Sequence, residues 1–149
     1  MGYTHYCYYK KKAVVSHPEF VKVMNYLKEV IGKFKVDEDA DEFVRYFVHD
    51  WIPYIWIHGG CETFIFPDQE DEEDEFHCTK TRQFRYDTYV VACHYIIRHF
   101  MPDVFKWSSD GCADELEEGY DLACEVLGEK IRNEVREAEE KDMVVNADC

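Results

Sequence analysis

Basic residues are scarce in this sequence, which has 17 lysines and arginines against 32 aspartates and glutamates and a formal net charge of −15. Binding to nucleic-acid phosphates requires clustered lysine and arginine, so we expect no general nucleic-acid binding. Such a surface is either simply solvated or attracts basic proteins. We therefore expect a protein partner, with a basic surface as one option.

Long apolar runs and closely spaced cysteine pairs are also absent from the sequence. Charged residues interrupt every apolar run, so we expect a soluble protein without a membrane partner. No cysteines have C-x-x-C spacing, which disfavours zinc, and we expect no cofactor. The seven cysteines are an odd number, and MGYTHYCYYKKK has no apolar signal core. These features predict free thiols in a reducing, intracellular environment.

Apolar residues make up 46% of the 149 residues and aromatic residues 16%, which predicts a packed core. No internal repeat or linker interrupts the chain. We expect a single domain over residues 1–128, followed at 129–149 by a charged helical extension and a loose C-terminal tail.

Hydrophobic periodicity predicts both strands and helices. YTHYCYY at 3–9 alternates as a first strand should, with Tyr3, His5, Cys7 and Tyr9 on one face. Apolar spacings of three and four predict helices from Ser16 to about Phe34, at 86–100, and at 116–127 with Gly128 closing the last. The stripe of the first helix consists of Phe20, Val23, Met24, Leu27, Val30, Ile31 and Phe34.

The middle of the chain is harder to assign, because residues 42–50 fit a helix or a strand and Pro53 interrupts either one. We expect a strand at 54–58, a Gly59-Gly60 turn and an antiparallel partner in CETFIF. Further strands are expected at 76–79 and 103–107, and the acidic segment 67–75 is expected to be a mobile loop. The predicted fold is α+β, with an antiparallel or mixed four- to five-stranded sheet and about three helices on one face.

Four segments occur in a recognisable order: GYTHY, CETFIF, FHCTKTRQFRYD and WSSDG, followed by a helix that ends in LACEVLG. In these segments the chain resembles a small uncharacterised family encoded by tailed phages, some bacteria and large DNA viruses of amoebae. The resemblance implies a viral or phage protein without an established activity. Its expected location is the host cytoplasm or nucleus, or the virus particle.

The segment WSSDG precedes the predicted helix at 116, and it has a structural and a functional interpretation. Ser108, Ser109 and Asp110 are the usual acceptors for the free amides of a helix start, and Gly111 suits a turn. Helix capping thus accounts for the composition. The functional interpretation is a binding site for an anion, formed by the same four residues.

In that functional interpretation, Lys80 and Arg82 add basic side chains to the binding site, and His5 acts as a general acid or base. His5, Lys80 and Asp110 are then the catalytic candidates of a phosphate-processing hydrolase. If a divalent cation takes part, Glu62 and Asp110 are its candidate oxygen ligands, although the sequence alone predicts no metal site.

Three functions remain open at the level of sequence. The leading prediction is a non-enzymatic protein-binding or host-interaction factor that uses its acidic surface or the aromatic face of its sheet. Such an aromatic face would also allow a homodimer. The alternative is the metal- or phosphate-dependent hydrolase centred on His5, Lys80 and Asp110, and the third is a structural component of the virion.

Overall fold

The computed structural model describes residues 3–69 and 75–147 of the chain, with backbone alone from residue 143. Its elements are β1 (Thr4–Tyr8), α1 (Lys11–Val15), α2 (Phe20–Gly32), the 3-10 turn η1 (Glu38–Ala40), β2 (Glu42–His49), β3 (Ile52–Gly59), β4 (Phe64–Phe66), β5 (Phe76–Lys80), α3 (Asp87–Phe100), β6 (Lys106–Ser109), α4 (Glu117–Leu127) and α5 (Glu134–Ala147).

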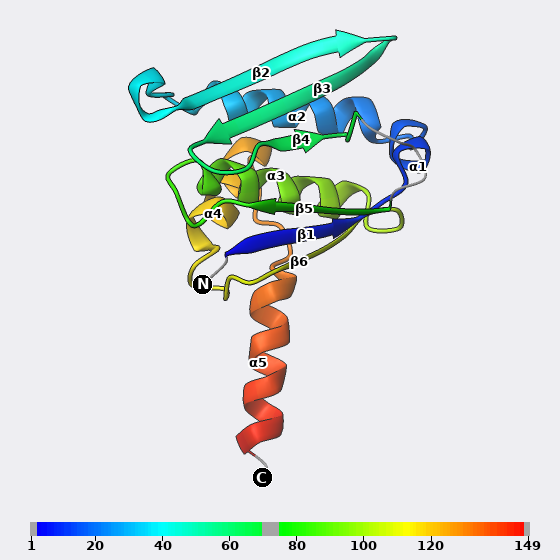
Figure 1. Ribbon diagram of the computed structural model, residues 1–149. Helices are drawn as coiled ribbons and strands as arrows, with labels where there is room; N and C mark the ends of the chain where they lie inside the picture. The colour runs from blue at the N-terminus through cyan, green and yellow to red at the C-terminus, as the bar shows by residue number, and fades with distance from the viewer. Residues whose placement is uncertain (1–2, 70–74, 148–149) are drawn as a thin grey trace.

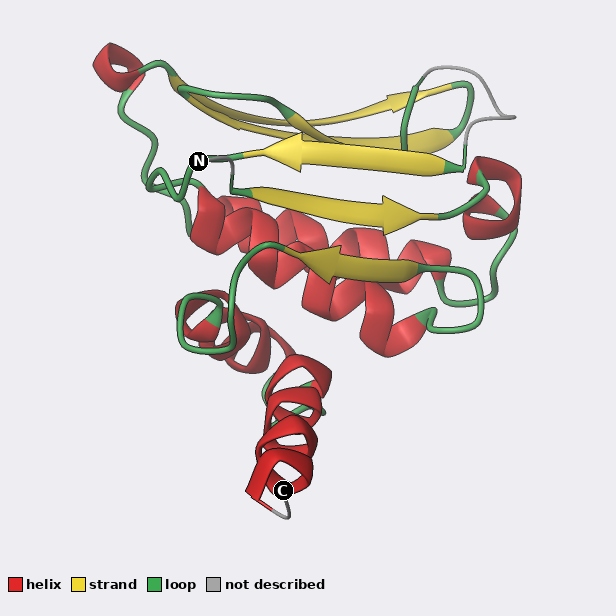
Figure 2. Ribbon diagram, turned by 60° about the horizontal axis from the view of Figure 1, so that its bottom comes forward, coloured by secondary structure: helices red, strands yellow, loops and turns green. Residues whose placement is uncertain are grey.

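The strands form two three-stranded antiparallel sheets, with the orders β5-β1-β6 and β2-β3-β4. In Figure 1 the strands of the β2-β3-β4 sheet lie above those of the β5-β1-β6 sheet, and Figure 2 shows α2 and α3 on one side of the strands. The predicted α+β class is therefore confirmed. Within the described residues, however, there are six strands in two sheets and five α-helices, instead of four to five strands and about three helices.

Helix α2 forms where the apolar stripe predicted it. All seven stripe residues are buried: Phe20, Val23, Met24, Leu27, Val30, Ile31 and Phe34. A stripe with this spacing occupies one side of a helix, so its burial packs α2 against α3 and against the β2-β3-β4 sheet. Hydrophobic burial rather than end capping therefore fixes this helix, because no side chain caps its N-terminus.

The start of that helix differs from the prediction. A separate short helix, α1, precedes it, and Ser16 Oγ donates a hydrogen bond to Lys12 O at 2.7 Å instead of accepting from a following amide. The last strand is displaced as well. The amides of Val104 and Phe105 both bond to Met101 O in a turn that follows α3, so β6 begins only at Lys106.

Residues 42–50, ambiguous in sequence, form strand β2 of a long hairpin with β3. Asp50 and Trp51 form its tip with φ values of 50° and 67°, the left-handed conformation that a two-residue hairpin turn requires. Pro53 lies within β3 opposite Val48 and does not end the strand. The predicted antiparallel pairing of the next two strands is confirmed, since β3 pairs with β4.

The chain ends in α5, which projects from the body in Figure 1. Gly128 closes α4 in the left-handed conformation with φ 71°, as predicted. Most of the segment predicted to be a mobile acidic loop, residues 70–74, lies outside the described residues. Among the residues that are described, no helix combines the length and the apolar character needed to cross a bilayer.

Candidate functional site

Sheet register brings two of the sequence candidates together. Strands β1 and β6 pair so that His5 lies directly opposite Ser109, and β5 places Thr79 opposite His5 on the other side. Because directly paired residues project from the same face of a sheet, His5 and Ser109 both point toward the helices. The alternation of β1 is as predicted, with His5 only 1% exposed and Tyr8 48% exposed.

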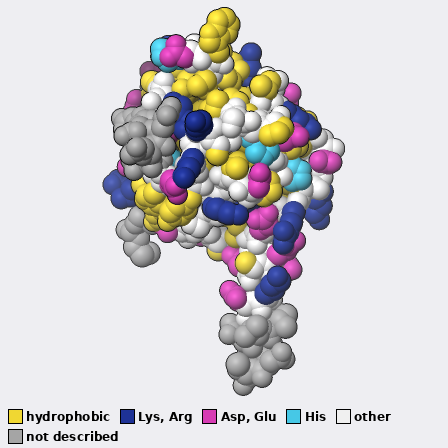
Figure 3. Space-filling view, turned by 90° about the vertical axis from the view of Figure 1, so that its right-hand side faces the viewer, with side chains coloured by type: hydrophobic (Ala, Val, Ile, Leu, Met, Phe, Trp, Pro, Cys, Tyr) yellow, Lys and Arg dark blue, Asp and Glu magenta, His cyan; other side chains and the backbone are white. Residues whose placement is uncertain are grey.

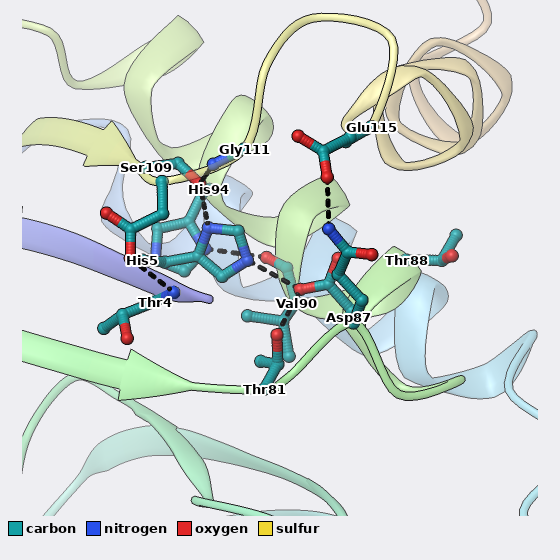
Figure 4. A network of polar contacts seen from close by, with 12 residues as sticks. Thr4, His5, Thr81, Asp87, Thr88, Val90, His94, Ser109, Gly111 and Glu115 are labelled. Atoms are coloured by element: carbon teal, nitrogen blue, oxygen red, sulfur yellow. Dashed lines mark hydrogen bonds and ion pairs between the residues drawn. The ribbon is translucent and has the colours of Figure 1, made fainter. Parts of the chain in front are cut away.

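Hydrogen bonds link Ser109, His5 and Asp87 in a row (Figure 4). Ser109 Oγ lies 2.8 Å from His5 Nδ1, and His5 Nε2 lies 2.6 Å from Asp87 Oδ1. The three side chains come from β6, β1 and the first residue of α3. We call this row the Ser109 relay.

The partners of the relay determine where its protons lie. A carboxylate can only accept, so the proton between Asp87 and the ring belongs to His5 Nε2. His5 Nδ1 is then free to accept. Ser109 Oγ already accepts from the amide of Gly111 at 3.0 Å, so its hydroxyl proton is available to His5 Nδ1. The imidazole is therefore oriented as a base toward the serine hydroxyl.

Asp87 is held in place from a second direction. Thr81 Oγ1 donates to Asp87 Oδ1 at 2.7 Å, and Thr81 is fully buried. Thr81 follows β5 directly and Asp87 begins α3, so the short connection between the two elements fixes the carboxylate. The carboxylate orients the imidazole as in a Ser-His-Asp triad, but with the two ring nitrogens exchanged, since Asp87 binds Nε2 and Ser109 faces Nδ1.

Aromatic rings surround the His5 imidazole. Tyr3 packs edge-on at 5.2 Å between ring centroids, and His94 and Trp107 lie at 5.4 and 6.1 Å. His94 is itself fully buried, and burial, with a smaller contribution from His5, lowers the pKa of His94 to about 3. His94 therefore stays neutral at ordinary pH, and its Nδ1 donates to Val90 O at 2.7 Å.

Ser109 also reaches open space. Its side chain is partly buried and lines a cavity of about 300 Å³ between β6 and α5, together with Trp107, Arg98, Glu134 and Val135. A cavity of this size admits a small molecule or a single side chain. The serine end of the relay thus faces a cavity, while the imidazole is enclosed.

The predicted capping role of WSSDG is wrong. Helix α4 begins only at Glu117 and has no side-chain cap. Asp110 instead ties down the end of β1, since its Oδ2 accepts from Thr4 N at 3.1 Å and from Tyr6 Oη at 3.3 Å. The side chain of Ser108 is exposed on the opposite face of β6 from Ser109, because neighbouring strand residues alternate.

The basic candidates take no part in the relay contacts. Lys80 ends β5 and pairs with Thr4. Because Thr4 is next to His5 in the strand, the side chains of Thr4 and Lys80 lie on the sheet face opposite to that of His5. Glu62 Oε1 accepts from the backbone amide of Lys80 at 2.6 Å. Arg82 is exposed in a turn with φ 55°, where its amide meets Tyr3 O.

Metal and thiol chemistry gain no support from the described residues. No group of three or more histidine, cysteine, aspartate or glutamate side chains in residues 3–69 and 75–147 is arranged to hold a metal ion. Burial raises the pKa of the Cys7 and Cys93 thiols, which keeps both protonated and unreactive. Of the cysteines described, all six are free thiols.

Sequence reasoning missed Asp87, Thr81 and the pairing of Ser109 with His5. The segments that carry the family resemblance contained the signal, since GYTHY supplies His5, FHCTKTRQFRYD supplies Thr81 and Asp87, and WSSDG supplies Ser109. Their convergence depends on strand register and on where α3 begins. Comparison of the chain with known protein families, with curated proteins and with solved structures finds no match.

Proposed function

We propose that the protein is a small hydrolase that uses Ser109 as nucleophile, His5 as general base and Asp87 to orient the base. The observation that carries the proposal is the Ser109 relay, in which two short hydrogen bonds join three side chains from separate segments. The triad of serine hydrolases is recognised by geometry and roles rather than by sequence order. Ester or amide hydrolysis is the reaction class that such a relay supports.

The chemistry follows from the contacts. Ser109 Oγ attacks a carbonyl carbon while His5 Nδ1 takes its proton, and Asp87 stabilises the resulting imidazolium through His5 Nε2. The leaving group departs with the proton from His5 Nδ1. Water then attacks the acyl-serine with His5 again as base, which releases the acid and restores the hydroxyl.

A matched pair of serines tests the proposal. Ser109→Ala removes the nucleophile, whereas Ser108→Ala changes the adjacent exposed serine, which also lines the cavity but lies on the sheet face opposite to His5. With p-nitrophenyl acetate as substrate, we expect Ser109→Ala to lower kcat/KM by about 10³-fold and Ser108→Ala to leave it unchanged. A fluorophosphonate should label Ser109 covalently, as located by mass spectrometry of peptides.

Circular dichroism and thermal unfolding of both variants separate lost chemistry from lost folding. Equal rates for the two serine variants, or a wild-type protein that neither hydrolyses the ester nor takes up the label, would contradict the hydrolase proposal.

Protein binding is the second candidate, and one observation favours it. Trp51 is 96% exposed at the tip of the β2-β3 hairpin, and Val48 nearby is 60% exposed. Figure 3 views the side of the molecule where this tip lies, and hydrophobic side chains there stand between charged ones. Large exposed aromatic residues are frequent anchors of protein interfaces.

The aromatic sheet face offers a second contact surface. Tyr8 and Phe76, on β1 and β5, are each nearly half exposed and pack with ring centroids 5.0 Å apart. A homodimer or a host protein is the proposed occupant, in keeping with a viral or phage origin. A virion role stays a prediction.

Sedimentation of the purified protein and capture from host lysate test the binding proposal. Wild type is compared with Trp51→Ser and with Phe76→Ser, one for each surface. We expect one of the two substitutions to abolish dimerisation or capture of a defined band. If the wild-type protein is a monomer and captures the same proteins as both variants do, the binding proposal is contradicted.

A further inference from the structure

The tip of the β2-β3 hairpin stands beside a cavity of about 340 Å³, which we call the tip cavity. Ile52, the first residue of β3, lines it together with Lys11, Lys12 and Val15 of α1 and with Ser16, which follows α1. Figure 1 shows the hairpin tip and α1 at the same end of the molecule. A cavity of this size admits one large side chain.

Trp51 is a large side chain that lies next to the tip cavity without filling it. The residue directly precedes Ile52, yet it is 96% exposed, so its indole is not packed in the cavity. Its backbone has the left-handed φ of 67° that the hairpin turn imposes. Because nearly all of the indole surface faces water, its burial against a second molecule is favourable.

The charges of the tip and of the cavity are complementary. Asp50 precedes Trp51 in the turn, and its side chain is 85% exposed. Lys11 Nζ stands 5.2 Å from the centre of the Tyr54 ring, whereas Lys12 is exposed at the cavity. A partner that carries an acid beside an indole would therefore match this cavity in charge as well as in shape. The tip of a second copy of the chain carries both.

A tip and a cavity that lie side by side make one patch complementary to itself. Such a patch pairs with a second copy around a twofold axis, because the rotation brings each tip onto the cavity of the other copy. We propose that the protein forms a dimer in which Trp51 of each copy enters the tip cavity of the other, with Asp50 facing Lys12. This inference rests on the protein-binding proposal, since it names the partner of the Trp51 surface.

The size of the contact predicts a weak dimer. An aromatic side chain buries about 150–250 Å² and covers a similar area of its partner, so two indoles account for roughly 600–1,000 Å² in total. Stable interfaces begin at about 1,200 Å². Both copies also carry a net charge of −15, and 0.15 M salt screens their repulsion beyond about 8 Å. We therefore expect dimerisation at tens to hundreds of micromolar protein in 0.15 M salt.

Two variants break the contact from opposite sides. Trp51→Ser removes the side chain that enters, and Ser16→Tyr places a ring in the cavity from an exposed position. In sedimentation velocity between about 10 μM and 1 mM, the wild-type protein should shift from monomer toward dimer. Each variant should stay monomeric, a loss of affinity of about 30-fold or more. Phe76→Ser, in the other sheet, is the control and should dimerise as the wild type does.

A mixture of the two variants tests whether tip and cavity meet each other. Neither variant has a usable contact with itself, since Trp51→Ser has no indole to insert and Ser16→Tyr has no open cavity. In the mixture, Trp51 of the Ser16→Tyr protein meets the open cavity of the Trp51→Ser protein. We expect a heterodimer that is weaker than the wild-type dimer, detected by fluorescence energy transfer between differently labelled variants.

The facing charges give a separate readout, which also decides if Ser16→Tyr does not fold. Lys12→Glu places an acid opposite Asp50 and should weaken the dimer by roughly three- to tenfold. Adding Asp50→Asn removes the facing acid and should recover most of that loss, because asparagine tolerates the left-handed backbone of the turn. Circular dichroism confirms the fold of every variant.

Three outcomes would overturn the dimer: a wild-type protein that is monomeric up to about 1 mM, a Trp51→Ser protein that dimerises as the wild type does, or a mixture without heterodimer. The protein-binding proposal fails separately. A monomeric wild type whose capture of a host protein is lost in Trp51→Ser refutes the dimer alone. Capture and dimerisation that are both unchanged in Trp51→Ser refute the dimer and the Trp51 binding surface together.

Discussion

His5 Nε2 lies 2.6 Å from Asp87 Oδ1, although the two residues are 82 positions apart in the sequence. The contact joins the central strand β1 to the first turn of α3 and fixes which ring nitrogen of His5 carries the proton. Because the opposite nitrogen faces Ser109, the position of one carboxylate determines whether a base is presented to the serine hydroxyl.

Asp87→Asn should therefore abolish activity while it preserves shape. An amide that donates to His5 Nε2 would move the ring proton to Nδ1, so that no base faces Ser109. We expect ester hydrolysis to fall by about 10³- to 10⁴-fold. The tautomer of His5, read from its ¹⁵N chemical shifts, should change in the same variant. An unchanged rate in a folded Asp87→Asn protein would contradict the role of the carboxylate.

A substitution of Lys80 distinguishes the Ser109 relay from the hydrolase site predicted from sequence, because only the predicted site includes Lys80. The hydrolase predicted from sequence places Lys80 beside His5 and Asp110, but Lys80 pairs with Thr4 and not with His5 in the sheet register. We expect Lys80→Met to leave kcat/KM for p-nitrophenyl acetate within about twofold of wild type, because a surface substitution rarely disturbs a distant site. A loss comparable to that of Ser109→Ala would restore Lys80 to the catalytic group.

Local patterns in the sequence predicted much of the fold because they report on burial. The stripe of α2 and the alternation of β1 each require one buried face, and Leu27 and His5 are buried accordingly. The ends of the helices and strands were predicted less accurately than their positions. Ser16 could cap a helix in principle, yet its hydroxyl bonds backward to Lys12 O, a choice that no local pattern decides.

The candidate site could be predicted only in part, because its members meet through pairing between distant strands. His5 and Ser109 were both recognised as functional residue types, but their contact depends on the β1-β6 register, which is set by packing on the inner sheet face. Asp87 was overlooked because an acidic residue in the first turn of a helix is common and explained by the helix dipole.

Gly111 allows Tyr3 to pack against His5, and a side chain at position 111 should disturb that contact. A Cβ at Gly111 would lie 2.6 Å from Tyr3 Oη and 2.9 Å from Tyr3 Cε2. We expect Gly111→Ala to destabilise the fold by about 1–3 kcal/mol in urea unfolding, the usual cost of overpacking. Combining it with Tyr3→Phe removes the hydroxyl and should recover part of the loss. Fully additive effects would argue against this contact.

His94 should make stability fall in acid. Burial, followed by the proximity of His5, lowers its folded-state pKa from 6.5 to about 3. Below pH 6.5 the unfolded chain therefore binds a proton at this residue that the folded chain refuses. The contribution of neutral His94 to the free energy of unfolding is fully present above pH 6.5. It is lost as pH falls toward 3, at roughly 1.4 kcal/mol per pH unit.

His94→Phe isolates this contribution, because the substitution removes the titrating group and keeps an aromatic ring near Trp107 and Phe64. At pH 7 the variant should be the less stable protein, since it loses the hydrogen bond to Val90 O. Between pH 6.5 and 4 the unfolding free energy of the wild type should fall, relative to that of the variant, by roughly 1.4 kcal/mol per pH unit. Urea titrations across this range measure it. A difference that stays constant with pH would mean that His94 takes up its proton in the folded protein as readily as in the unfolded chain.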